Sequence, residues 1–96
     1  MYVQMRFDWD DAKALSNLAK HGISFELAKR VWDDPLYEVT FGRVVDGEER
    51  WLAVGVVGTT TIIVVVHAFP DLEDDQRVRI ISARKATSQE RRQHER

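Results

Sequence analysis

The sequence predicts an α+β domain in which a short first strand leads into two helices that pack on one face of an antiparallel four-stranded sheet, followed by a short C-terminal helix. Apolar residues recur at helical spacing between residues 11 and 33, and they alternate with polar residues after Pro35. The dipeptides Asp46-Gly47 and Gly58-Thr59 mark turns between apolar segments. A chain of 96 residues is suited to one compact domain, so we expect residues 1–96 to form a single domain.

Two helices are expected in the first third of the chain. The first covers residues 11–20, where Asp10 stands at the N-cap position and Gly22 supplies a left-handed stop. The second begins after Ser24, another N-cap residue, and ends at Asp33-Asp34-Pro35. The short connection predicts a tight helical hairpin.

Strands are expected where apolar and polar residues alternate or where a segment is almost wholly apolar. These segments are residues 5–9, 37–45, 50–57, 60–69 and 77–83. The segment 60–69 is so rich in valine and isoleucine that both of its faces should be covered, as in a central strand. Thr87 and Glu90 have capping-box spacing, which predicts a terminal helix. With the helix pair on one face of the sheet, only this helix borders the other face.

Charge is divided unevenly along the chain, whose net charge is −2. Residues 1–75 hold seven Lys/Arg and fourteen Asp/Glu, whereas residues 76–96 hold seven Lys/Arg and two Asp/Glu. Clustered positive charge within an acidic protein is compatible with nucleic-acid binding. The alternative is a solvated strand face and helix with no ligand.

Composition excludes several classes of function. The chain has no cysteine, which rules out disulfides, thiolate-bound zinc and cysteine nucleophiles. His21, His67 and His94 lack metal-site spacing, and no phosphate-binding or dinucleotide glycine motif is present, so we expect neither metal nor cofactor. We also expect a cytoplasmic protein that does not enter membranes, because no apolar run reaches the length of a signal peptide or a bilayer span.

The remaining polar groups suit phosphodiester chemistry without a metal. Cleavage of RNA by its own 2′-hydroxyl needs a base, an acid and positive charge around the phosphorane, and histidine, glutamate, lysine and arginine supply these roles. Such side chains gather near the end of the last expected strand and the start of the terminal helix: Arg79, Arg84, Lys85, Glu90 and Arg91.

Two separated groups of motifs resemble the BrnT family of type II toxin–antitoxin toxins. They are Phe7-Asp8-Trp9-Asp10-Asp11-Ala12-Lys13, Asn17 and Lys20-His21-Gly22-Ile23-Ser24-Phe25-Glu26, and then Glu49-Arg50, Gly55, Arg79-Ile80-Ile81-Ser82-Ala83-Arg84-Lys85-Ala86-Thr87 and Glu90-Arg91. The resemblance implies a RelE-like fold and an endoribonuclease that slows translation and growth. It also implies a BrnA-type antitoxin, in a complex of two toxins and two antitoxins, that neutralises the toxin and reaches operator DNA through its own DNA-binding part.

The chain departs from the family pattern in two places. It has His94 where the family commonly has tyrosine, and four residues precede Met5, where the family often starts. If the tyrosine holds RNA, His94 replaces it by stacking or by titrating near neutral pH.

The sequence and the resemblance together give two sets of site residues. The catalytic set is Arg84, His21, Arg79, Glu90 and Lys85, and the RNA-binding set is Arg50, Arg91, Trp51 and His94.

Each of these residues also has a structural interpretation. His21 can hydrogen-bond its turn, Arg84 and Lys85 can pair with Asp33, Asp34 or a loop acid, and Glu90 can serve only as the capping partner of Thr87. Arg50 can pair with Glu49, while Trp51 can pack against the antitoxin instead of a base. His67, Trp9 and Trp32 are expected in the core.

Two other functions remain open at the level of sequence. The first is a catalytically weak binding module that acts as co-repressor with the antitoxin on operator DNA. The second is a toxin-like protein whose activity has decayed, with His94 as the clue. Cleavage of RNA separates both from a ribonuclease.

Overall fold

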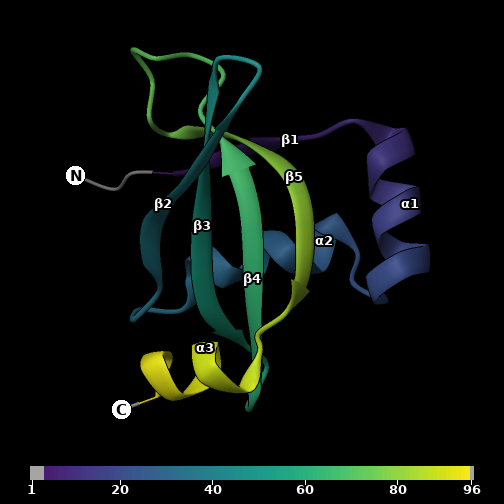
Figure 1. Ribbon diagram of the computed structural model, residues 1–96, viewed down its shortest axis with the longest axis vertical. Coiled ribbons are helices and arrows are strands. Elements are labelled where there is room, and N and C mark those ends of the chain that lie inside the picture. Colours follow the sequence, from purple (N-terminus) through teal and green to yellow (C-terminus); the bar gives the residue numbers. More distant parts are fainter. Residues whose placement is uncertain (1–3, 96) are drawn as a thin grey trace.

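The computed structural model describes residues 4–95 as a sheet with helices on both sides and at one edge (Figure 1). The elements in chain order are β1 (Arg6–Asp8), α1 (Asp11–His21), α2 (Phe25–Ala28), a 3₁₀ helix η1 (Lys29–Asp33), β2 (Glu38–Val45), β3 (Glu48–Val57), β4 (Thr61–Ala68), β5 (Arg77–Lys85) and α3 (Ser88–His94).

Local signals set the helix ends as predicted. The Asp10 side chain accepts a hydrogen bond from the backbone N–H of Lys13, and Gly22 ends α1 with φ of 70°. Ser24 caps α2 in the same way. Thr87 and Glu90 form both hydrogen bonds of a capping box at the start of α3.

The second helix differs from the expectation of one α-helix up to Asp33. It is α-helical only over Phe25–Ala28 and continues as the 3₁₀ helix η1. Pro35 accounts for the last turn of η1, because it has no N–H to donate to the carbonyl of Val31 at α-helical spacing. That carbonyl accepts the N–H of Asp34 instead, at 3.1 Å, which is the tighter 3₁₀ pattern.

The expected four-stranded antiparallel sheet is wrong in one respect, because the sheet has five strands and is mixed. The strand order is β1-β5-β4-β3-β2, and β1 pairs parallel to β5 with Arg6 opposite Arg77 and Asp8 opposite Arg79. An ion pair between Asp8 and Arg77 supports this pairing across distant parts of the chain. The expected RelE-like arrangement is therefore matched only in its α+β class.

The helices take three positions around the sheet. Figure 1 shows α2 behind the sheet, α1 beside β5, and α3 crossing the front of its lower end. The core lies between α2, η1 and the rear face of the sheet, and it includes Phe25, Val31, Ile63 and Ile80. Gly55 permits this close packing, because a Cβ there would lie 3.0 Å from both Cγ1 and the carbonyl oxygen of Val31.

The central position of β4 is confirmed. Its residues Ile62, Ile63, Val64 and Val65 are all buried, so the strand is covered on both faces. The upper part of the front face carries no helix (Figure 1), which leaves the region that the sequence predicted to be open. Among the described residues, no helix is long and apolar enough to cross a membrane.

Candidate functional site

Arginines from three strands lie on the front face of the sheet. Arg43 of β2 is opposite Arg50 of β3, and both line a hollow of about 370 Å³. The other lining residues are Gly42, Leu52, Val66, Ile81 and Ser82. Because side chains alternate along strands, Arg84, which is opposite Val64, shares the face of Val66. The front face can therefore present several guanidinium groups to an anion.

Glu48 holds two of these arginines together. One of its carboxylate oxygens lies 3.3 Å from Nε of Arg50, and the other accepts a hydrogen bond from Nη1 of Arg79 at 3.3 Å. The alternative interpretation of Arg50, a pair with Glu49, is not found, since Glu48 is its partner. Arg43 makes no ion pair within residues 4–95. One carboxylate thus pairs with two arginines, and with Arg43 nearby positive charge remains in excess.

Arg84 is held by Glu90 through two hydrogen bonds. Nη1 and Nη2 of Arg84 donate to Oε1 and Oε2 of Glu90 at 2.7 and 3.1 Å. Oε1 also accepts the backbone N–H of Thr87 at 2.8 Å. The hydrogen bond from Arg84 lowers the pKa of Glu90 to about 2, and the same bond raises the pKa of Arg84. The carboxylate is therefore a weak proton acceptor at neutral pH, and its contacts orient Arg84.

A local irregularity of β5 lies between the front face and α1. The pairing of β5 with β4 shifts by one residue here. Ser82 is opposite Val66 and Ile80 is opposite His67, so Ile81 between them has no opposite residue. Such a bulge redirects side chains. Ile81 and Ser82 line the arginine hollow and also a second hollow of about 200 Å³.

His21 enters the site through that second hollow. It is the last residue of α1, it is exposed, and it lines the hollow together with Lys13, Ser16, Asn17, Lys20, Ile81 and Ser82. The shared residues Ile81 and Ser82 make the histidine and two lysines neighbours of the arginine hollow. An imidazole thus borders the cationic face.

Asn17 fixes α1 against β5, a role that the sequence analysis did not assign. Its amide nitrogen donates to the carbonyl oxygens of Ile23 and Ala83 at 2.9 Å each, and its Oδ1 accepts the N–H of Ala83 at 3.1 Å. The side chain is buried. Helical periodicity could not have found this residue, because the apolar side chains of Leu15 and Leu18 are exposed while the polar Asn17 is buried. Asn17 therefore positions His21.

Four expected site residues make none of these contacts with the arginine hollow. Lys85 is opposite Ile63, a core residue, so it lies on the other face from Arg84. Trp51 is opposite His67 and packs against Phe41 and Phe69 on the rear face. Arg91 is exposed on α3, and His94 is on the same helix. No described residue pairs with the charge of Lys85 or Arg91.

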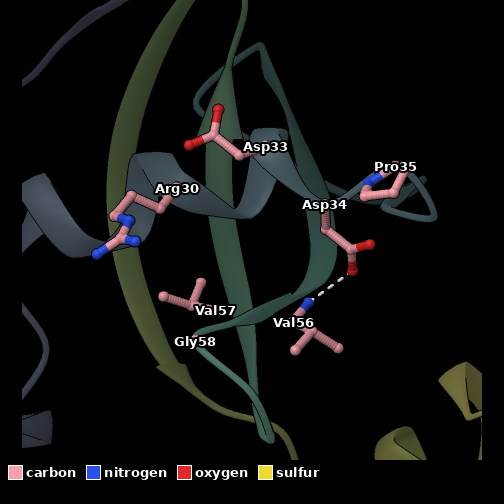
Figure 2. A pocket seen from close by; sticks show the side chains of 7 residues that line it. All are labelled: Arg30, Asp33, Asp34, Pro35, Val56, Val57 and Gly58. Atoms are coloured by element: carbon pink, nitrogen blue, oxygen red, sulfur yellow. Dashed lines mark hydrogen bonds between the residues drawn. The ribbon is translucent and has the colours of Figure 1, made fainter.

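His94 is buried rather than exposed for stacking on a base. Its Nε2 lies 3.4 Å from Oδ2 of Asp34, and its Nδ1 lies 3.3 Å from Oε1 of Glu38. Asp34 Oδ2 also accepts the backbone N–H of Val56 at 2.7 Å, the contact drawn in Figure 2. This hydrogen bond is the main cause of the lowered pKa of Asp34. His94 therefore joins α3 to the β2 edge. The partner of Asp34 is His94 and not Arg84.

His67 is a core histidine, as predicted. It is fully buried, and its ring packs against Trp32 and Phe69 with centroids 5.0 and 5.3 Å away. Burial lowers the pKa of His67 to about 4, so the ring is neutral at pH 7. Trp9 and Trp32 also pack against the core, which confirms their predicted place.

Another hollow, of about 190 Å³, brings the candidate residues Glu90 and His94 together and shares Leu52 with the arginine hollow. The hollow in Figure 2, of about 310 Å³, is lined by Arg30, Asp33, Asp34, Pro35, Val56, Val57 and Gly58. Residues 4–95 also contain no group of three or more His, Cys, Asp or Glu residues that could hold a metal ion.

Comparisons with known proteins agree with this description. The family model of the ribonuclease toxin BrnT of type II toxin–antitoxin systems matches residues 9–90. The crystal structure of the Brucella abortus ribonuclease toxin BrnT is similar, with a TM-score of 0.66 and 25% identity over 88% of this chain and 100% of that chain. No curated protein sequence matches. The family match spans most of the chain, and the chain therefore belongs to the BrnT family of ribonuclease toxins of type II toxin–antitoxin systems.

Proposed function

We propose that this chain is an endoribonuclease that cleaves RNA on the front face of its sheet without a metal ion. The observation that carries the proposal is the convergence of Arg43, Arg50, Arg79 and Arg84 on one face, with His21 at its margin. Guanidinium groups bind phosphate in two-point geometry, and they stabilise the charge of a phosphorane. A histidine at the same place supplies proton transfer.

The proposed reaction uses the RNA's own 2′-hydroxyl. Its oxygen attacks the adjacent phosphorus while His21 accepts the hydroxyl proton, and the bond from phosphorus to the 5′-oxygen breaks. Water protonates the leaving oxygen. The products are a 2′,3′-cyclic phosphate and a 5′-hydroxyl. Arg79 and Arg84 stabilise the added negative charge, Arg50 holds the flanking phosphate, and Glu90 is a positioning residue for Arg84.

The partner that we propose is a BrnA-type antitoxin, in a complex of two toxins with two antitoxins. Cleavage of RNA in the cytoplasm would inhibit translation and growth until the antitoxin binds. Operator DNA would be contacted through the antitoxin, because residues 1–75 carry seven more acidic than basic side chains. This acidic part would weaken direct binding to duplex DNA.

The test is cleavage of a defined single-stranded RNA by the purified chain in EDTA. We expect the wild type to cut, Arg84→Ala to lose at least roughly 100-fold in rate, and Arg30→Ala to cut normally. Arg30 is the matched control, because it is exposed and lies in the hollow of Figure 2, outside the site. Loss of cutting in EDTA that magnesium restores would contradict metal-free cleavage.

A second function has one observation in its favour. Arg50, Arg79 and Arg84 all contact carboxylates of the chain itself, which reduces their attraction for phosphate. A co-repressor subunit with weak catalysis would not need arginines that are free to bind phosphate. The same experiment separates the two functions, because such a subunit would leave the RNA intact.

A further inference from the structure

An apolar surface at the β2 edge lies on the rear face of the sheet, away from the arginines. We call it the aromatic strip, and it consists of Val39, Phe41, Val44, Trp51, Phe69 and Leu72. Phe41 is 50% exposed, Val44 is 56% exposed and Leu72 is 93% exposed. Large side chains with this exposure are unusual when they adjoin one another, and adjoining ones mark interaction surfaces.

The aromatic strip is continuous with the core. The ring of Phe41 packs edge-on against Trp51 at 5.3 Å, and Trp51 packs against Phe69 at 6.2 Å. Phe69 in turn contacts the buried ring of His67 at 5.3 Å. Rings anchored in this way are already ordered, so a partner would lose little conformational entropy in binding them.

A hollow at one end of the strip has an acidic lining. Its volume is about 490 Å³, and it is lined by Gly47, Glu48, Glu49, Trp51, Phe69, Pro70 and Leu72. Of its two carboxylates, Glu48 already pairs with Arg50 and Arg79, so Glu49 is the one that remains for a partner. The carboxylate of Glu49 makes no ion pair within the described residues. Figure 1 shows the β2–β3 turn and the β4–β5 loop, which carries Asp71, Glu73 and Asp75, at the same end of the molecule.

The charge of this surface selects its occupant. RNA could stack on exposed rings, but its phosphates would be repelled by Glu49 and the acidic loop. A polypeptide segment with apolar and basic side chains would satisfy both the rings and the carboxylates. The adjacent edge strand adds main-chain groups, because within residues 4–95 β2 pairs with no strand but β3, which leaves its other side for an extended segment.

We propose that the aromatic strip and its acidic hollow bind a basic, apolar segment of the antitoxin on the side of the sheet opposite the ribonuclease face. This inference rests on the proposed function in one respect, because it assumes that an antitoxin protein binds the chain. This segment lies outside the proposed RNA site, so it anchors the antitoxin, and a different part of the antitoxin must cover the arginine face to stop cleavage.

The test measures the affinity of the full-length chain for its cognate BrnA-type antitoxin, purified as a full-length protein. Two variants change the surface without removing a buried group: Leu72→Ser and Glu49→Lys. Leu15→Ser and Asp11→Lys make the same changes on α1, where both residues are exposed. We expect Leu72→Ser and Glu49→Lys each to bind antitoxin at least roughly tenfold more weakly. The α1 variants should bind normally, and all four should cut RNA like the wild type.

Three results would overturn the inference. Normal antitoxin affinity of both surface variants would show that the segment binds elsewhere, and would leave the proposed function standing. Weaker RNA binding by Leu72→Ser would make the strip an RNA site. Absence of any antitoxin binding by the wild type would remove the partner from the proposed function, and this inference with it.

Discussion

The guanidinium of Arg84 and the carboxylate of Glu90 form a two-point pair, with N···O distances of 2.7 and 3.1 Å, and the same carboxylate caps α3. One side chain thus connects the end of β5 to the start of α3. The pair keeps Glu90 ionised and fixes the direction of Arg84 on the front face. A motif that looks structural in the sequence therefore has a direct effect on the proposed site.

Replacing Glu90 by Gln should remove an acid-sensitive part of the stability. The pKa of Glu90 is lowered to about 2 in the folded chain, so its contribution is complete above the unfolded pKa of about 4.5 and disappears as the pH falls towards 2. Allowing for solvent screening, we expect about 1–2 kcal/mol. Urea unfolding at several pH values should show this loss in the wild type and not in Glu90→Gln. Parallel curves for the two proteins between pH 5 and 2 would contradict the role of the pair.

His67 should give a second acid-sensitive step at higher pH. The folded chain holds its pKa at about 4, whereas the unfolded chain has a value near 6.5, so protons bind the unfolded state first. Stability is full above pH 6.5 and falls by up to about 3 kcal/mol towards pH 4. His67→Gln should lack this slope whatever its absolute stability, while Glu90→Gln should keep it. A slope that persists in His67→Gln would assign it to another group.

Asn17→Ala should destabilise the chain and impair cleavage together. It removes three hydrogen bonds and leaves buried groups of Ile23 and Ala83 without partners, which costs about 2–4 kcal/mol. Urea unfolding measures the loss, and Leu15→Ala on the exposed side of α1 is the control. Without urea, and at a temperature where the variant is folded, its cleavage rate should still fall because His21 is displaced. Normal stability would show that α1 is held by other contacts.

His21→Ala should separate chemistry from binding. The residue is exposed and makes no hydrogen bond to another described side chain, so the fold should persist. Loss of a general base lowers kcat by roughly 10²–10⁴ with little change in KM. Arg43→Ala should instead raise KM, because Arg43 lies in the hollow without an ion pair in the described chain. Single-turnover and steady-state cleavage assays distinguish the two, and a normal kcat in His21→Ala would exclude it as the base.

Local features of the fold were predictable because their causes are local. Asp10, Gly22 and the Thr87–Glu90 box act within one helical turn, and the Asp46-Gly47 turn follows from left-handed φ values of 50° and 81°. The parallel pairing of β1 with β5 was not predictable. It joins residues about seventy positions apart, and a strand of three residues, Arg6–Asp8, is too short for its pattern to indicate which strand it pairs with.

The geometry of the candidate site was only partly predictable from the sequence. Alternation already separates Arg50 from Trp51, but which face is open depends on where α2 and η1 pack. The bulge at Ile81 changes which β5 side chains share a face, and no turn residue announces it. His94 could not be placed from sequence, since its partners Asp34 and Glu38 belong to other elements.

The most direct test of the central claim compares two oligonucleotides of the same sequence, one RNA and one DNA, incubated with the purified chain in EDTA. We expect that only the RNA is cut and that its upstream fragment ends in a 2′,3′-cyclic phosphate, identified by mass spectrometry. Cleavage of the DNA strand at a similar rate, or RNA fragments with a 5′-phosphate, would contradict attack by the 2′-hydroxyl on the arginine face.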